Sequence, residues 1–391
     1  MIVITGGPGT GKTTIIRFIA SILEDGGCSV SLAAPTGRAA KRIAEATGFE
    51  ARTIHRLLEY VPETGFMKNA ESPLPCDALI LDEASMIDVP LMHSVMDALS
   101  IFTRLIIVGD ANQLPPVGPG NVLKDILRSG RIPSVRLNEI FRQAKLSRII
   151  QNAHRILHGE MPVLEPDGSD FLFEEIHSPE RIRTAVIREA RQSLRNGLQP
   201  NEFQVLAPMK KGSLGVIQLN RDLQEALNPP APGKREYRYG DALYREGDRI
   251  MQIKNNYLME WEKPDEIGSG VFNGDLGTIA RIDVPDRMME LCFDDGRTAR
   301  YDFSSLSEIT HAYCISIHKS QGSEFDTVLL PVYSYGSPLL SRNLLYTAVT
   351  RAVREFRCIG TLTAVERMVE NNSILRRYSA LKYRLLSAPD N

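Results

Sequence analysis

The feature that most constrains this chain is residues 6–13, GGPGTGKT, which follow an apolar run at 2–4 and precede a helical run at 14–23. Glycines allow backbone N–H groups to curl around an anion, and the amino end of the helix adds partial positive charge. Lys12 then brings a full charge to the phosphate oxygens, and the hydroxyl of Thr13 suits Mg²⁺. The motif therefore predicts a nucleoside triphosphate site of the P-loop type. The residues expected to bind the nucleotide here are Gly7, Pro8, Gly9, Thr10, Gly11, Lys12, Thr13 and Thr14.

Two later apolar runs also end in residues suited to phosphate chemistry. The run at 79–81 ends in Asp82 and Glu83, and the run at 106–108 leads into a polar turn that contains Gln113. At the carboxyl edge of a parallel sheet, Asp82 is expected to ligate Mg²⁺ and Glu83 to activate water. The amide of Gln113 is expected to sense the γ-phosphate or the attacking water. A glutamate after the aspartate favours hydrolysis over transfer to a bound acceptor.

Short apolar runs alternate with helical stretches along the chain. Those at 30–34, 78–81, 105–108 and 134–137 are predicted to be buried parallel strands. This alternation predicts a doubly wound α/β domain at 1–140. A second α/β domain is predicted at 141–391, with helices at 146–157 and 179–194, strands at 203–207 and 328–332, and no phosphate loop of its own.

Two stretches interrupt these series. Residues 61–76 are rich in Pro, Gly, Glu and Asn, which predicts a protruding hairpin or loop that is too polar for a core. Residues 239–309 are rich in strand-forming residues, with turns at Asn273-Gly274 and Asp295-Gly296. They predict a small β-barrel inserted into the second domain.

Composition restricts the class of protein further. A net charge of −2 excludes a generally basic surface, so any nucleic acid must be bound by local groups. The five cysteines are widely spaced, which predicts free thiols, and no apolar run approaches the ~18 residues of a membrane span. We expect a soluble cytoplasmic protein. Because the first strand begins at residue 2, we also expect a fragment or shortened form of a longer chain.

Ordered sequence blocks then give a specific resemblance over nearly the whole chain. They are GGPGTGKT, APTGRAAKR, TIHRLL, LDEAS, VGDANQLPPVGPG, LNEIFRQ, SIHKSQGSEFD and LLYTAVTRA. Together they resemble the RecD/TraA branch of superfamily 1 DNA helicases. The resemblance implies two RecA-like P-loop NTPase domains, with a hairpin (pin) at 61–76 and an SH3-like barrel at 239–309. It also implies a monomeric motor that uses ATP and Mg²⁺, moves 5′ to 3′ on single-stranded DNA and acts at junctions between single and double strands.

The resemblance also implies residue roles. Arg142 and Arg351 match the two arginines that face the γ-phosphate in the family, where such a residue is worth ~10³ to 10⁵ in rate. A block close to the nucleotide is matched by Gln321, Gly322 and Glu324. Positions that contact the DNA strand are matched by Pro35, Thr36, Gly37, Arg38, Thr53, His55, His318 and Lys319.

Alternatives remain open at this point. One is a DNA-stimulated ATPase or translocase that does not unwind duplexes, and another is a subunit that binds DNA in response to nucleotide without turnover. Family members carry an upstream glutamine that reads adenine, and this sequence has no counterpart to it before Met1. Adenine selectivity and the choice between repair and conjugation therefore stay open.

Overall fold

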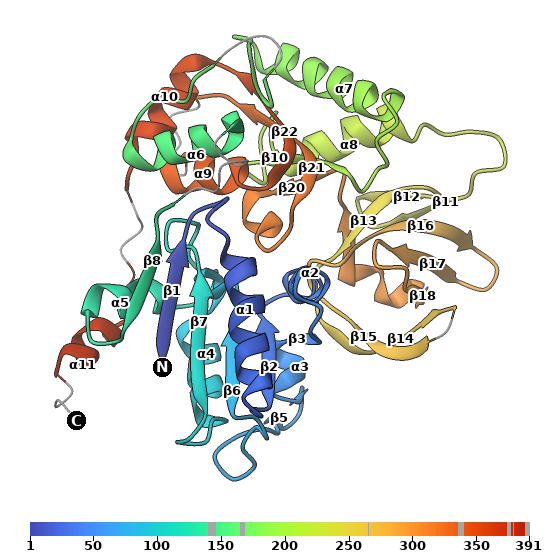
Figure 1. Ribbon diagram of the computed structural model, residues 1–391. Coiled ribbons are helices and arrows are strands. Elements are labelled where there is room, and N and C mark those ends of the chain that lie inside the picture. The colour runs from blue at the N-terminus through green and yellow to red at the C-terminus, as the bar shows by residue number, and fades with distance from the viewer. Residues whose placement is uncertain are drawn as a thin grey trace. The chain divides into compact units, whose positions relative to one another are not determined.

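The computed structural model describes residues 1–139, 146–164, 169–264, 266–334, 340–373, 377 and 379–387. They divide into two compact units (Figure 1). The first comprises Met1–Glu160, Gln321–Ser323 and Asn372–Asn391, and the second comprises Met161–Ser320 and Glu324–Asn371. Helix α6 (Arg148–His158) belongs to the first unit, so the division falls later than the boundary at 141 expected from the sequence.

The first unit is built on a six-stranded parallel sheet in the order β3-β2-β6-β7-β1-β8. Alternate side chains of strand β6 point to opposite faces of the sheet. Ile80 packs with α1 and α2 on one face, whereas Leu79 and Leu81 pack on the face covered by α4 and α5. This two-faced burial confirms the doubly wound fold. The strands are β1 (Ile2–Gly6), β2 (Val30–Ala34), β3 (Ala51–Thr53), β6 (Ala78–Leu81), β7 (Arg104–Gly109) and β8 (Ser134–Leu137). The helices are α1 (Lys12–Asp25), α2 (Gly37–Thr47), α3 (Ile54–Leu57), η1 (Ala84–Met86), α4 (Val89–Asp97), α5 (Val122–Ser129) and α11 (Leu381–Ser387).

Strand β8 differs from its expectation. It pairs in parallel with β1, as expected, but Ser134, Val135 and Arg136 are exposed. The prediction of a buried strand is therefore wrong, because β8 lies at the edge of the sheet.

The predicted hairpin at 61–76 is present only in part. Strands β4 (Tyr60–Val61) and β5 (Gly65–Phe66) pair in antiparallel fashion and form a hairpin. At the other end of this segment, Leu74 and Cys76 are 5% and 9% exposed and lie in the core below α4. The expectation that the whole segment is too polar for a core is wrong there, since these two apolar side chains anchor it.

The second unit contains a five-stranded parallel sheet in the order β20-β10-β21-β22-β9. Its core packs Ile182 and Val186 of α7 and Leu219 and Leu223 of α8 onto the sheet. The strands are β9 (Phe171–Glu175), β10 (Phe203–Ala207), β20 (Cys314–Ser316), β21 (Phe325–Val332) and β22 (Ala352–Gly360). The helices are α7 (Pro179–Arg195), α8 (Val216–Leu227), η4 (Ile317–Ser320), α9 (Arg342–Val349) and α10 (Leu362–Glu370).

The predicted β-barrel insertion forms an antiparallel seven-stranded sheet with its own core around Trp261, Tyr301 and Phe303. The expected turns are confirmed by positive φ angles of 101° at Gly274 and 86° at Gly296. Its elements are β11 (Glu236–Tyr239), β12 (Ala242–Arg245), β13 (Arg249–Gln252), β14 (Asn256–Lys263), β15 (Glu266–Val271), β16 (Leu276–Asp283), β17 (Met288–Phe293), β18 (Thr298–Asp302), η3 (Phe303–Glu308) and β19 (Ile309–His311), with β11 and β12 in a separate hairpin.

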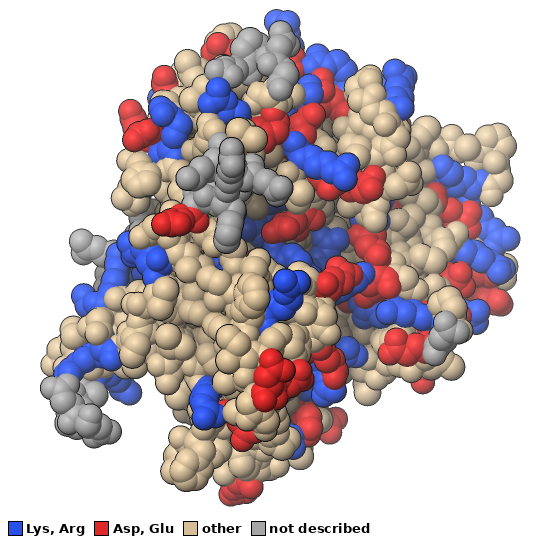
Figure 2. Space-filling model, in the orientation of Figure 1, with Lys and Arg blue, Asp and Glu red and all other residues tan. Residues whose placement is uncertain are grey.

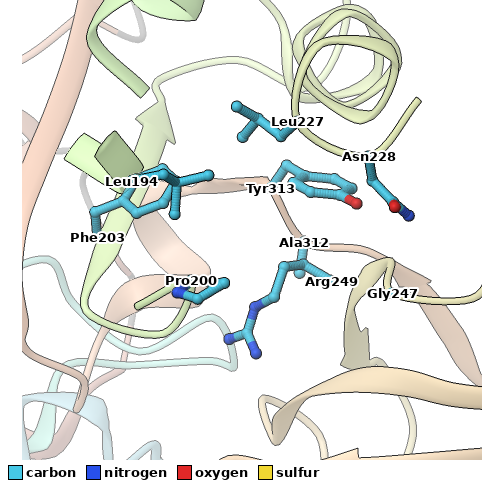
Figure 3. A pocket seen from close by; sticks show the side chains of 9 residues that line it. All are labelled: Leu194, Pro200, Phe203, Leu227, Asn228, Gly247, Arg249, Ala312 and Tyr313. Atoms are coloured by element: carbon cyan, nitrogen blue, oxygen red, sulfur yellow. The ribbon is translucent and has the colours of Figure 1, made fainter. Parts of the chain in front are cut away.

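A buried carboxylate joins this barrel to the α/β part of the second unit. Asp248 is fully buried and accepts hydrogen bonds from Gln224 (2.6 Å), Asn228 (2.7 Å) and Tyr313 (2.9 Å). Beside it lies a cavity of about 80 Å³, bordered by Leu227, Tyr313 and other side chains (Figure 3). None of the residues that line this cavity is one that the sequence analysis expects to bind nucleotide or DNA.

Surface and thiol features agree with the composition. On the face drawn in Figure 2, basic and acidic side chains are interspersed, which matches the net charge of −2. All five cysteines are free, and burial raises the pKa of the Cys314 and Cys358 thiols. Within the described residues, no helix is both long and apolar enough to cross a bilayer.

Candidate nucleotide and DNA site

The phosphate loop lies between the end of β1 and the start of α1. Gly9 and Gly11 have φ angles of 70° and 79°, a left-handed conformation that residues with a Cβ rarely adopt. Gly6 is required for space, because a Cβ there would lie 2.6 Å from Oγ1 of Thr10. That hydroxyl donates to the carbonyl of Gly7 at 2.8 Å and closes the loop.

Positive charge gathers inside this loop. The ammonium of Lys12 donates to the carbonyl oxygens of Gly6 and Gly7, each at 2.9 Å. The first turn of α1 has no acidic residue, and its N-cap, Gly11, offers no side-chain acceptor. The N–H groups at this end are therefore available to an anion, as the sequence predicted.

The two predicted acids follow β6 at the same edge of the sheet. Asp82 and Glu83 are 4% and 5% exposed. Burial and the neighbouring Glu83 raise the pKa of Asp82 to about 6, while Arg42 and Lys12 partly offset this rise. Glu83 adopts φ 50° and ψ 38°, a strained conformation of a kind that concentrates at functional sites.

These oxygens fit Mg²⁺ bound together with a nucleotide. Within the described ranges, no group of three or more His, Cys, Asp or Glu side chains could hold a metal by itself. Mg²⁺ typically takes one or two protein oxygens and completes its shell with phosphates and water. The carboxylate of Asp82 and the hydroxyl of Thr13 are of the required type.

Gln113 lies in the turn that follows β7, the strand between β6 and β1. Its side chain is 7% exposed, and its Oε1 is buried without a hydrogen-bond partner among the described residues. The same holds for Oγ of Ser85, two residues after Glu83. Such unpaired buried atoms are rare and suggest groups reserved for a ligand.

Residues 321–323 belong to the first unit although the flanking strands belong to the second. The amide of Gln321 donates to the carbonyl of Leu114 at 2.9 Å. Gly322 has a φ of 75°, and a Cβ there would lie 2.7 Å from Oγ1 of Thr36. The structure thus brings two predicted nucleotide-side residues onto the turn after Gln113 and onto the start of α2.

The remaining predicted nucleotide contacts lie elsewhere. Arg351 belongs to the second unit and is 2% exposed, with its guanidinium donating to the carbonyl of Thr347 (3.3 Å) and to Oγ1 of Thr350 (3.2 Å). Glu324 is exposed in the same unit. Arg142 lies outside the described residues.

The predicted DNA contacts of the first unit surround the starts of α2 and α3. Residues 35–38 are all partly buried, and the hydroxyl of Thr36 caps α2 by accepting from the N–H of Ala39 at 3.3 Å. Thr53 is 7% exposed and caps α3. His55 packs against the rings of Tyr60 and Phe66, and this burial lowers its pKa.

Two further predicted DNA contacts belong to the second unit. His318 and Lys319 are exposed in η4, and the ammonium of Lys319 donates to Oδ1 of Asn273 in the barrel turn at 2.5 Å. This contact places Lys319 beside the barrel, which the sequence could not indicate.

Sequence reasoning assigned no role to Arg42. Its guanidinium lies 2.9 Å from Oε1 of Glu83. The available signal was its spacing, because Arg42 follows Arg38 by four positions and so shares a helix face with it.

Family models match three parts of the chain. Residues 1–119 match an AAA domain, residues 219–293 match the SH3 domain of ATP-dependent RecD-like DNA helicases, and residues 311–357 match the C-terminal domain of UvrD-like helicases. The second match overlaps the β-barrel insertion.

Similar proteins cover nearly the whole chain. The ATP-dependent RecD2 DNA helicase of Deinococcus radiodurans is 37% identical over 97% of this chain and 50% of the relative, so the chain spans about half of that protein. The RecBCD enzyme subunit RecD of Mycolicibacterium smegmatis is 32% identical over 99% of this chain and 72% of the relative.

Solved structures support the fold. A crystal structure of Bacteroides Pif1 bound to single-stranded DNA has a TM-score of 0.55 and 21% identity, and covers 94% of this chain and 90% of that one. A second structure, from work on DNA unwinding at forked double-stranded DNA by two coordinating Pif1 helicases, has a TM-score of 0.55 and 22% identity. The match covers 94% of this chain and 89% of that one. Because the match to the RecD subunit extends over most of both chains, this chain belongs to the RecD-like family of superfamily 1 helicases.

Proposed function

We propose that this chain is the motor core of a DNA helicase that hydrolyses ATP and moves 5′ to 3′ along single-stranded DNA. The observation that carries the proposal is the buried pair Asp82 and Glu83 at the sheet edge that also holds Lys12. A site that only bound nucleotide would have no need of a second, strained carboxylate beside the metal ligand. The direction of movement rests on family resemblance.

The proposed chemistry divides the roles among few side chains. Lys12 and the N–H groups at the start of α1 hold the β- and γ-phosphates. Asp82 and Thr13 ligate Mg²⁺, which neutralises phosphate charge when bound. Glu83 accepts a proton from the attacking water, and the amide of Gln113 orients that water or the γ-phosphate.

Arg142 and Arg351 are proposed to stabilise charge that develops on the γ-phosphoryl group. For Arg351 this requires that its guanidinium exchange the Thr347 and Thr350 oxygens for phosphate oxygens. Arg351→Ala should therefore lower kcat strongly while leaving ATP binding nearly intact.

The DNA substrate is proposed to contact residues 35–38, Thr53, His55, His318 and Lys319. Phosphate contacts carry no base information, so binding should be nonspecific and weakened by salt. The β4–β5 hairpin is proposed to act as the wedge at a junction between single and double strands.

The test combines ATPase and strand-displacement assays on the 391-residue chain. We expect oligo(dT) to stimulate ATPase and the protein to displace the strand of a 5′-tailed duplex but not of a 3′-tailed one. Glu83→Gln should abolish both activities and retain nucleotide binding.

Stimulated ATPase without displacement would instead indicate a translocase. That outcome is relevant because the chain spans about half of its Deinococcus relative. Negligible ATPase with DNA present would indicate a nucleotide-dependent binding subunit and would overturn the proposal.

A further inference from the structure

Arg42, on the second turn of α2, contacts the proposed catalytic base directly. Its Nη2 lies 2.9 Å from Oε1 of Glu83 and 4.0 Å from Oδ2 of Asp82. The side chain of Glu83 is 6% exposed and that of Arg42 is 27% exposed, so this charge-assisted hydrogen bond is partly shielded from water. The oxygen that accepts this hydrogen bond is held in place by the guanidinium, which fixes the orientation of the carboxylate.

The same helix face carries the predicted DNA contact Arg38. Residues four apart lie one above the other on a helix, and long side chains lean toward its amino end. This general geometry places the expected path of the Arg42 side chain on the side of the turn where Thr36 and Arg38 begin α2 (Gly37–Thr47). A DNA phosphate bound at that turn would be a second anion within reach of Arg42.

Tight packing connects α2 to the segment that follows the base. A Cβ on Gly322 would lie 2.7 Å from Oγ1 of Thr36, 3.4 Å from Cβ of Ala39 and 3.7 Å from Sδ of Met86. Met86 belongs to η1, which begins directly after Glu83. Gly322 thus lies against both the start of α2 and the turn after Glu83, so that a shift of either segment alters the packing around this glycine.

We propose that Arg42 is a positioning residue that restrains the carboxylate of Glu83 until single-stranded DNA binds at the start of α2. A DNA phosphate then competes with Glu83 for the guanidinium, and the released carboxylate accepts the proton of the attacking water. This device couples hydrolysis to occupancy of the DNA site within the first unit alone. It rests on the proposed ATPase and DNA-binding function.

A different role for the same ion pair must be distinguished. Arg42 could serve only to offset repulsion between two buried acids, since its charge lowers the pKa of Asp82. In that case its removal would impair hydrolysis equally with and without DNA. Under the proposal, its removal raises the rate without DNA and leaves the rate with DNA nearly unchanged.

The experiment measures steady-state kcat and KM for ATP, with and without saturating oligo(dT), for the full chain and for Arg42→Ala. We expect kcat without DNA to rise about tenfold, a typical value for one charge-assisted hydrogen bond. The stimulation by DNA should fall by the same factor, with KM for ATP unchanged. Arg42→Lys, which keeps the charge but not the fork of donors, should give an intermediate value and serves if Arg42→Ala folds poorly.

Lys41→Ala is the matched control. Lys41 is the preceding residue of α2 and pairs at 3.6 Å with Glu45 on the exposed surface, where such pairs contribute little. We expect its kinetic constants to equal those of the unmodified chain.

Two failures can be told apart. If the unmodified chain shows no DNA-stimulated ATPase, the proposed function fails. If it is stimulated but Arg42→Ala is stimulated by the same factor, or loses both rates in parallel, only the restraint by Arg42 is refuted.

Discussion

Gln113 allows a prediction in which stability and activity change in opposite directions. Its Oε1 is buried without a hydrogen-bond partner among the described residues, while its backbone N–H donates to the carbonyl of Asp110 at 3.2 Å. An unsatisfied buried polar atom costs ~1–3 kcal/mol. Replacing Gln113 with Met keeps the length and volume of the side chain and removes that cost.

Gln113→Met should therefore raise the stability of the first unit by about 1 kcal/mol, or roughly 2–4 °C in Tm for a unit of this size. Its DNA-stimulated kcat should fall by about 10²-fold, because one oriented hydrogen-bonding group is lost. Calorimetry measures the first quantity and a coupled ATPase assay the second.

Gln204→Met is the control with the opposite sign. The amide of Gln204 is also buried but donates to the carbonyls of Val205, Ala312 and Tyr313 at 3.0–3.2 Å. Its loss should destabilise the second unit by ~1–3 kcal/mol. If Gln113→Met instead unfolds more easily, or hydrolyses ATP at the unmodified rate, the unpaired oxygen is not reserved for the reaction.

Three other predictions follow from local geometry. Gly322→Ala should lower the stability of the first unit by about 2 kcal/mol, because its Cβ would collide with Thr36 and its φ is 75°. It should also reduce the stimulation of ATPase by DNA. Thermal unfolding measures the first effect and an ATPase assay the second. Asp248→Asn should destabilise the second unit by about 3 kcal/mol, because an amide nitrogen would face donors that now bond a carboxylate, as measured by denaturant unfolding. Burial holds the pKa of His55 below its usual 6.5, against the opposing charge of Asp88. The unfolded chain therefore binds a proton first as the pH falls, stability should decline below about pH 6.5, and His55→Asn should decline less in thermal melts at pH 7.5 and 5.5.

Matched controls make these results decisive. The control for Gly322→Ala is Gly274→Ala. A Cβ on Gly274 would meet no atom within 4 Å, and the φ of this residue is 101°, so the variant measures backbone strain without a collision. An equal loss of stability in both glycine variants would contradict the packing argument. Asp286→Asn is exposed and should be neutral. The control for the pH series is His177→Asn, which alters an exposed histidine. If the stability of His177→Asn declines between pH 7.5 and 5.5 as little as that of His55→Asn, burial of His55 is not the cause of the decline.

Much of the fold followed from local patterns. Continuous apolar runs predicted β2, β6 and β10 within a residue of their bounds, since such short runs are typical of buried parallel strands. The pairing order was not predictable in this way. Strand β8 (Ser134–Leu137) alternates polar and apolar residues, and it is exposed because it lies at the edge of the sheet, where no strand pairs with its other side.

For the candidate site, the sequence by itself determined where the phosphate loop, the two acids and Gln113 lie in the fold, because each belongs to the segment that follows a strand; their roles stay predictions. Only the tertiary structure decided that residues 321–323 join the first unit, that Lys319 contacts the barrel, and that Arg42 contacts Glu83. These contacts join residues far apart in the chain, and they depend on the order in which strands pair and on the helix faces turned toward one another, which local periodicity does not encode.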